Sequence, residues 1–203
     1  MLTRAGWPAG DMKAFVLLLF LSIALPVHGS TRLYYLGIVE AQWDYFPNRR
    51  ETPDFGKANC TQGLGSILKK AVYKQYHDAS YSVEVSQPAW LGFLGPIIKA
   101  EVGDQIIIHL KNFASRPYSI HPHGVHYEKD SEGSLYPDQT FGKNKLDDAI
   151  APSGSHTYTW TVTDEHAPTE DDPGCLTWIY HSHVDAPRDI SSGLIGPLLT
   201  CKK

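Results

Sequence analysis

The sequence predicts an all-β domain of the sandwich or barrel type, and three observations lead to this prediction. Proline and glycine are frequent, with 14 and 17 residues respectively. Short runs rich in β-branched and aromatic residues recur along the chain, and turn residues separate them. Many short strands with turn signals between them are typical of β-sandwiches and β-barrels.

The individual strands can be followed in order along the chain. The predicted strands cover residues 33–39, 71–76, 97–101, 105–112, 118–121, 157–162, 176–181 and 196–201. The run 157–162 alternates polar and apolar side chains with period two, as a half-buried strand requires. A helix is expected only at 65–70. Residues 130–152 lack strand periodicity and predict a long polar loop, which is usually functional or held by other groups.

The amino terminus has the pattern of a secretory signal peptide. An apolar run at 15–25 follows a lysine and precedes small residues at 26–29. We therefore expect residues 1–29 to be a signal peptide, with Met12 as a possible true start, and 30–203 to form a single domain. The apolar run is too short for a comfortable membrane span.

Composition narrows the possible function classes. The formal net charge is −4, and the basic residues are scattered rather than gathered in a stripe, so nucleic-acid binding is not expected. No second long apolar stretch follows the predicted signal peptide, so no transmembrane segment is expected in the mature chain. We expect a secreted or extracellular protein, or the extracellular part of a longer membrane-anchored form.

The three cysteines agree with secretion. Cys175 and Cys201 lie near the ends of adjacent predicted strands, and a disulfide between them would contribute roughly 3 kcal/mol in the chain-entropy model. Cys60 is left without an assigned role. It lies inside an N-x-T acceptor sequence, which makes Asn59 a candidate for N-glycosylation.

Two His-x-His pairs are the main chemical signal in the chain. They are His121 with His123 and His181 with His183, and both follow predicted strands. Residues i and i+2 of a strand point to the same face, so each pair presents two imidazoles side by side. Imidazole suits copper, zinc and iron, so the spacing alone leaves the metal open.

The other polar residues near these pairs receive more ordinary interpretations. His126 is expected at the surface, and His109 is expected to be a hydrogen-bonded histidine of the core. Asp185 follows the second pair closely and could orient an imidazole or cap the turn at Ala186 and Pro187.

Several longer motifs together resemble the first domain of the ceruloplasmin/hephaestin multicopper ferroxidases. They lie at residues 92–96, 100–104, 111–124, 180–187 and 192–197. The resemblance extends over essentially all of 31–203, and the motif around the first histidine pair is closer to hephaestin. It implies a cupredoxin fold, which is a Greek-key β-barrel, and it implies copper as the metal.

The resemblance also implies roles for the four histidines. His121 corresponds to a type 2 copper ligand, whereas His123, His181 and His183 correspond to type 3 ligands. In this family a facing carboxy-terminal cupredoxin domain completes a trinuclear cluster, which reduces O₂ to water while Fe²⁺ is oxidised. The chain would therefore supply half of the cluster.

Position 182 departs from the electron-entry motif of the family. That motif is His-Cys-His, and its cysteine also ligates a type 1 copper. A blue copper site needs a His₂Cys arrangement, and Ser182 cannot supply the thiolate. No type 1 copper is expected in this domain.

The resemblance further implies a calcium site in the long polar loop. Asp147, Asp148, Asn144 and the carbonyl of Lys129 align with calcium ligands of the family. Calcium takes six to eight oxygen ligands, including carbonyls. From the residues alone, a solvated acidic turn is the ordinary interpretation of an Asp-Asp pair.

Three hypotheses follow for the function. The chain is expected to be the amino-terminal portion of a larger secreted ferroxidase, inactive in isolation. The alternatives are a non-enzymatic secreted copper-binding domain and a scaffold domain of the coagulation-factor A type. The retained histidine pairs argue against the scaffold.

Overall fold

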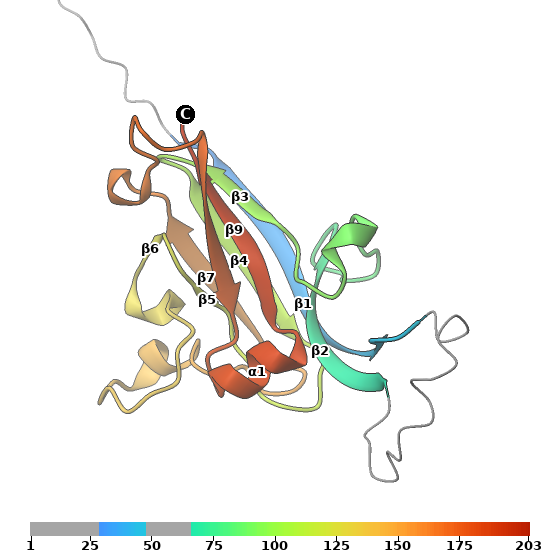
Figure 1. Ribbon diagram of the computed structural model, residues 1–203. Coiled ribbons are helices and arrows are strands. Elements are labelled where there is room, and N and C mark those ends of the chain that lie inside the picture. Colours follow the sequence, from blue (N-terminus) through green and yellow to red (C-terminus); the bar gives the residue numbers. More distant parts are fainter. Residues whose placement is uncertain (1–28, 48–65) are drawn as a thin grey trace, which may run out of the picture.

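The computed structural model describes residues 29–47 and 66–203, which form two facing β-sheets (Figure 1). The five-stranded sheet has the order β2 (Ile67–Tyr76), β1 (Thr31–Asp44), β4 (Gln105–Asn112), β7 (Ser155–Thr161) and β6 (His126–Tyr127). The four-stranded sheet has the order β3 (Ile98–Glu101), β9 (Ile195–Cys201), β8 (Cys175–His181) and β5 (His121–Pro122). The predicted all-β fold is confirmed. Residues 1–28 of the expected signal peptide, Asn59 and Cys60 lie outside the described residues.

Helical structure within the described residues is short. Helix α1 (Ala186–Ser192) lies between β8 and β9. The 3₁₀ turns cover Ala89–Leu91, Lys129–Ser131, Gly142–Lys145 and Asp164–His166, and two of them lie in the long polar loop. None of the helices in the described part of the chain is long and apolar enough to cross a membrane.

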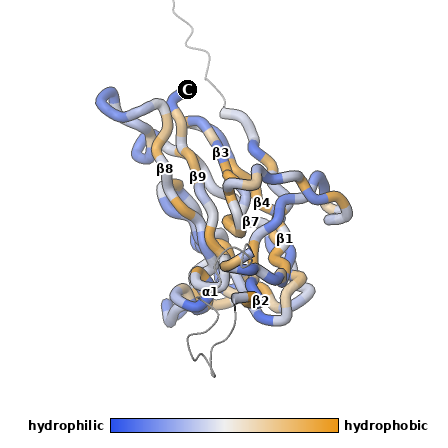
Figure 2. Tube along the Cα trace, turned by 45° about the vertical axis from the view of Figure 1, so that its right-hand side comes forward, coloured by the Kyte–Doolittle hydropathy of each residue, from blue (hydrophilic) through white to orange (hydrophobic). Residues whose placement is uncertain are grey.

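The alternating pattern of the sequence places one face of each strand in the core. In β4, Ile106, Ile108 and Leu110 have no exposed surface, and in β7 the same is true of Tyr158 and Trp160. Because successive strand residues point to opposite faces, these side chains meet between the two sheets. Figure 2 shows hydrophobic residues along β7, β8 and β9, with more hydrophilic residues in many of the connecting loops.

Three buried tyrosines are hydrogen-bonded inside the core. Each phenol donates to a backbone carbonyl outside its own strand: Tyr73 to Ser119 (2.6 Å), Tyr158 to Asp147 (2.7 Å) and Tyr180 to Pro96 (2.6 Å). Burial raises the pKa of each of these phenols well above 10. They therefore act as neutral donors that attach loops to the barrel interior.

The structure corrects the helix predicted at 65–70. Residues 67–70 form the first part of β2, where Leu68 pairs with Trp43 and Lys69 pairs with Gln42 of β1. Strand β1 is 14 residues long, so it offers a long edge to which this segment adds. Pairing with β1 overrides the weak local preference for a helix.

Two further expectations concern His109 and the turn before β4. His109 is hydrogen-bonded, because its Nδ1 lies 2.8 Å from Thr157 Oγ1, but it stacks on Tyr35 on the partly exposed face rather than in the core. The expectation of a core position was wrong, because the inward face of β4 is already filled by its apolar residues.

The turn at Gly103 and Asp104 is present, and it connects strands of different sheets.

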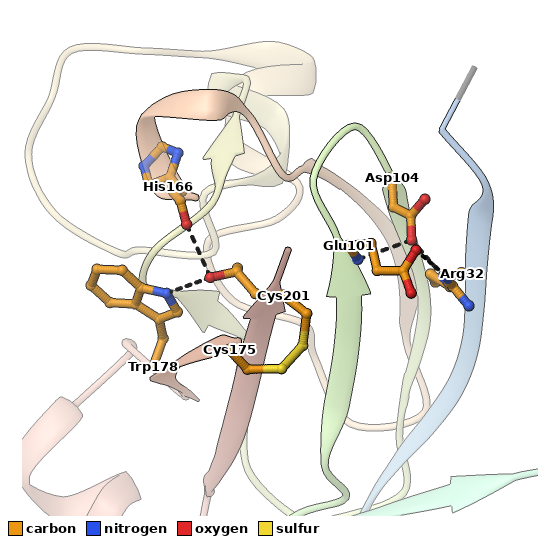
Figure 3. Close-up of a disulfide and its surroundings, with 8 residues drawn as sticks. Arg32, Glu101, Asp104, His166, Cys175, Trp178 and Cys201 are labelled. Atoms are coloured by element: carbon orange, nitrogen blue, oxygen red, sulfur yellow. Dashed lines mark hydrogen bonds and ion pairs between the residues drawn. A yellow bond between two sulfur atoms is a disulfide. The ribbon is translucent and has the colours of Figure 1, made fainter. Parts of the chain in front are cut away.

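The buried carboxylate of Asp104 fixes the start of β1. It accepts hydrogen bonds from Arg32 Nε (2.6 Å), Ser30 N (2.7 Å) and Glu101 N (3.0 Å). Figure 3 shows its contacts with Arg32 and Glu101. Burial raises the pKa of this carboxyl, but the hydrogen bonds and the Arg32 charge outweigh it, so the net shift is downward. The edge where β1, β3 and β4 meet is therefore held by an ionised buried side chain.

A disulfide joins Cys175 and Cys201, as predicted (Figure 3). The two residues are directly paired across the antiparallel strands β8 and β9, and their Cα atoms are 4.0 Å apart. Close to it, Trp178 Nε1 donates to the buried Thr200 hydroxyl (2.9 Å), which in turn donates to the carbonyl of His166 (3.0 Å). The disulfide fixes the register of the strand that ends at His181.

Candidate metal centre

The structure brings the two histidine pairs together at one end of the four-stranded sheet. His121 of β5 pairs directly with His181 of β8, and the amide of His123 donates to the carbonyl of Ile179 (2.9 Å). The ring centroids of His121 lie 5.2, 5.6 and 5.2 Å from those of His123, His181 and His183. Residues that are about 60 positions apart in the sequence thus form one cluster of four imidazoles.

Backbone carbonyls set the tautomers of two of these rings. His121 Nδ1 lies 2.7 Å from the carbonyl oxygen of Glu132, and His181 Nδ1 lies 2.9 Å from that of Ser182. A carbonyl only accepts hydrogen bonds, so each Nδ1 carries the proton and each Nε2 keeps a free lone pair. His183 Nδ1 is likewise engaged, by Ser134 Oγ at 2.9 Å. This is the arrangement by which outer hydrogen bonds prepare histidines for metal ligation.

His123 and His181 approach most closely. Their Nε2 atoms are 3.0 Å apart, and the rings stack at 5.2 Å between centroids. Two imidazole nitrogens that share one metal ion, each about 2.0–2.1 Å from it, are separated by roughly 3 Å. Without a metal, His123 Nε2–H donates a hydrogen bond to His181 Nε2, because the proton of His181 is on its Nδ1. The donor set therefore fits at least one soft or borderline metal ion.

The cluster favours neutral imidazoles. Burial, followed by the neighbouring histidines, lowers the pKa of His121 to about 4. Burial also lowers the pKa of His181, and partial burial together with His183 lowers that of His123. Neutral imidazole is the form that ligates metals, so the lowered pKa values of His121, His123 and His181 favour metal binding at neutral pH. His181 is buried, whereas His123 is exposed, so the cluster is open on the His123 side.

Two of the residues expected to bind calcium, Asp147 and Asp148, lie in a second polar centre. Asp147 and Asp148 are buried, and the Oδ1 atom of each lacks a hydrogen-bond donor among the described residues. Asp147 Oδ2 accepts the amide of Gly133 (2.7 Å), and burial raises the pKa of this carboxyl. Asn144 lies in the adjoining 3₁₀ turn, where its carbonyl accepts the Thr140 hydroxyl (3.2 Å). Two buried carboxylates with unsatisfied oxygens fit a hard cation.

Lysine side chains also reach this centre, which the sequence did not indicate. Lys129 Nζ lies 2.7 Å from Glu132, 2.8 Å from Asp138 and 3.6 Å from Asp148. Lys145 Nζ lies 2.7 Å from both Asp138 and Asp148. Asp138 and Glu132 were missed because nothing in their local sequence separates them from ordinary loop carboxylates.

The remaining candidates lie outside both centres. His126 is exposed, as expected, and its Nε2 is 3.7 Å from Glu128. Asp185 occupies the N-cap position of α1 without a side-chain capping bond. The carboxylate beneath the second histidine pair is instead Asp189, which accepts a hydrogen bond from Ser182 and was not singled out in the sequence.

Comparison with known proteins adds the family. The multicopper oxidase family model matches residues 75–203. The chain is 56% identical to mouse (Mus musculus) hephaestin over 207 residues, 55% identical to human (Homo sapiens) ferroxidase HEPHL1 over 208, and 45% identical to human ceruloplasmin over 202. These alignments cover 96%, 97% and 95% of this chain, but only 18%, 18% and 19% of the relatives. The chain thus spans less than a fifth of their length.

Solved structures agree on the fold. A multicopper oxidase from Pseudomonas thermotolerans matches with a TM-score of 0.53 and 17% identity, over 85% of this chain and 30% of that one. The multicopper oxidase mgLAC matches with a TM-score of 0.50 and 22% identity, over 86% of this chain and 39% of that one. With the two-sheet architecture, the paired histidines and the family match, the chain belongs to the multicopper oxidase family.

Proposed function

We propose that this chain is the amino-terminal cupredoxin domain of a secreted ferroxidase and supplies half of a trinuclear copper cluster. His121 is the type 2 ligand, and His123, His181 and His183 are the type 3 ligands. The observation that carries the proposal is the convergence of these four imidazoles, with the Nε2 atoms of His123 and His181 only 3.0 Å apart. A relative that is 55% identical is a ferroxidase, which supports Fe²⁺ as the substrate.

The chain's own residues would bind the metal, orient the ligating imidazoles and leave one side of the site accessible. The carbonyls of Glu132 and Ser182 orient His121 and His181 so that each Nε2 faces the cluster. The exposed side at His123 is where a facing carboxy-terminal cupredoxin domain would add the remaining ligands. Copper, once bound, would supply the electron-transfer chemistry that couples Fe²⁺ oxidation to the reduction of O₂ to water.

Ser182 supports the absence of a type 1 copper from this domain. Its side chain is fully buried, and its hydroxyl is engaged with Asp189 (2.7 Å) and with the amide of Ser119 (3.1 Å). A hydroxyl is a poor copper ligand compared with a thiolate. Electrons must therefore enter from the facing domain, and the isolated chain should not turn over.

Copper content tests the ligand assignment. The secreted chain is loaded with copper, dialysed and analysed for metal, alongside His121→Ala, His181→Ala and the exposed control His77→Ala. We expect the two cluster variants to lose most of the bound copper and the control to match the parent chain. Unchanged copper in both cluster variants would refute the site.

Iron oxidation tests the half-site. We expect no steady Fe²⁺ oxidation by the copper-loaded chain alone, and the appearance of activity when the remaining domains of the protein are present. Steady turnover by the chain alone would contradict the proposal, whereas copper binding without activity in the longer protein would favour a non-enzymatic copper-binding domain. A coagulation-factor A-type scaffold leaves the four converging imidazoles unexplained.

A calcium ion is proposed for the second polar centre, held by Asp147, Asp148, Asn144 and the carbonyl of Lys129. The buried Oδ1 atoms of Asp147 and Asp148, which accept no hydrogen bond among the described residues, support it, although Lys129 Nζ lies 3.6 Å from Asp148 Oδ1. Calcium titration followed by calorimetry should give one site, and the double variant Asp147→Asn/Asp148→Asn should abolish it. The proposal fails if calcium neither releases heat nor raises the unfolding temperature.

Processing of the chain is proposed from the sequence pattern. We infer removal of the signal peptide near Ser30 and glycosylation of Asn59 during secretion. Amino-terminal sequencing and peptide mapping of the secreted protein test both. A retained 1–29 segment or an unmodified Asn59 would contradict them.

A further inference from the structure

Ser182 separates the two histidines of the second pair and points away from them. It has no exposed surface. Its hydroxyl donates to Asp189 Oδ2 at 2.7 Å, and its oxygen accepts the amide of Ser119 at 3.1 Å. Because the Ser182 hydroxyl donates its hydrogen bond to Asp189, a lone pair of the hydroxyl oxygen is free to accept the amide of Ser119.

Ser119 continues the connection toward the first histidine pair. It lies two residues before His121 and also has no exposed surface. Its oxygen accepts the amide of His183 (3.0 Å), and its hydroxyl donates to the carbonyl of Gly133 (2.6 Å). The two serines thus tie the segment before β5 to the segment after β8 by two hydrogen bonds on the buried side of the histidines.

The Gly133 end of this connection lies in the loop that orients two of the imidazoles. On one side of Gly133, the carbonyl of Glu132 accepts from His121 Nδ1. On the other side, Ser134 Oγ contacts His183 Nδ1, and Ser134 also bridges to His183 through the backbone. A shift of Gly133 would therefore change the hydrogen bonds of both rings.

Asp189 anchors the other end. It lies in helix α1, is only 3% exposed, and also accepts the amide of Asp185 (3.1 Å). A hydrogen bond to a carboxylate is about twice as strong as one between neutral groups. The backbone reinforces this anchor, because the Ser182 amide donates to the Leu194 carbonyl and the Leu194 amide donates to the Asp189 carbonyl.

We propose that Asp189, Ser182 and Ser119 are positioning residues that hold the two histidine pairs in register for copper binding. None of the three touches the metal; they act through the backbone of His183 and through the Glu132–Ser134 loop. The inference rests on the proposed function, because it assigns the network to the copper site. It explains why a buried carboxylate and two buried hydroxyls lie beneath imidazoles that face the opposite way.

The first experiment measures copper affinity by competition with a chromophoric chelator. Ser182→Ala removes one buried hydroxyl with two hydrogen bonds. The matched control is Thr200→Val, which also removes a buried hydroxyl with two hydrogen bonds, but from the opposite end of the four-stranded sheet, where Thr200 pairs with Leu176. We expect copper to bind roughly 10- to 100-fold more weakly to Ser182→Ala, the usual effect of losing an outer hydrogen bond, and normally to Thr200→Val. Equal affinities in the two variants would overturn the proposal.

The second experiment needs no metal. Long-range ¹⁵N–¹H spectra of the metal-free chain report which ring nitrogen of each histidine carries the proton. His121 should be a single Nδ1–H tautomer in the parent chain and in Thr200→Val, and a mixture in Ser182→Ala and Asp189→Leu. Asp189→Asn keeps an acceptor oxygen for Ser182, so His121 should keep the single tautomer in this variant, in contrast to Asp189→Leu.

The two experiments separate the proposals. If the parent chain binds no copper but the tautomers of His121 respond as described, the positioning network stands and the copper assignment fails. If copper binds at the histidines but Ser182→Ala and Asp189→Leu leave affinity and tautomers unchanged, the positioning network is wrong.

Discussion

Acidification should destabilise the metal-free chain through its histidine cluster before the carboxylates contribute. The pKa of His121 is about 4 in the folded chain, against 6.5 for an ordinary histidine, because burial and the neighbouring rings disfavour its charged form. Between these two values the unfolded chain binds more protons than the folded chain. The stability is therefore fully present above pH 6.5 and is lost as the pH falls toward 4.

The size of the effect follows from the two pKa values. Between pH 7 and pH 5, preferential protonation of the unfolded state through His121 alone corresponds to just under 2 kcal/mol. The ring is partly exposed, and solvent screening reduces this to about 1 to 1.5 kcal/mol. The lowered pKa values of His123 and His181 act in the same direction, so the total for the cluster is larger than for His121 alone.

Urea denaturation at half-unit steps from pH 7 to pH 5, in the presence of a metal chelator, measures the effect. His121→Gln should flatten the pH dependence by about 1 to 1.5 kcal/mol, and His77→Gln serves as the control for loss of a histidine elsewhere. The reasoning is refuted if the parent chain keeps the same free energy of unfolding from pH 7 to pH 5, or if both variants show the parent's slope.

Three further predictions concern stability. Replacing Cys175 and Cys201 by serine should lower the free energy of unfolding by roughly 3 kcal/mol in urea titrations, and a loss below about 1 kcal/mol would contradict the loop-closure estimate. Gly124→Ala should lower the free energy of unfolding by more than about 2 kcal/mol, because Gly124 has φ +73° and an added Cβ would lie 2.1 Å from the Trp178 ring. Thermal unfolding measures the loss, and an unchanged melting temperature would contradict it. Asp104→Ala should lower the free energy of unfolding by about 3 kcal/mol, because three partly buried hydrogen bonds lose their acceptor, and the loss should shrink in an Arg32→Ala background; an unchanged loss there would show that the two side chains are uncoupled.

Much of the fold could be predicted from local pattern. The alternation at 157–162 and the apolar positions of 105–112 gave strands close to β7 and β4, because one face of each strand is buried. Helix α1 was missed, although Pro187 in its first turn and Gly193 at its end are signals that could have located it. Its seven residues are too few to show helical periodicity.

The candidate metal centre could be predicted only in part from the sequence. Spacing of two residues placed His121 beside His123, because strand geometry is local. The contact between His123 and His181 depends on the pairing of β5 with β8, which no local pattern encodes. Asp189 was missed for the same reason, because its partner Ser182 is seven residues away and precedes helix α1, in which Asp189 lies.

The hydroxyls of Tyr73 and Tyr158 reach from the core to the two segments proposed to bind metal ions. Tyr73 donates to the carbonyl of Ser119, two residues before the proposed copper ligand His121, and Tyr158 donates to the carbonyl of Asp147 in the proposed calcium site. A conservative packing change that rotates either ring would disturb ion binding while the strands remain paired. If the proposed sites bind copper and calcium, reduced metal content in a variant would not by itself identify a damaged ligand, because a packing fault inside the barrel would have the same effect.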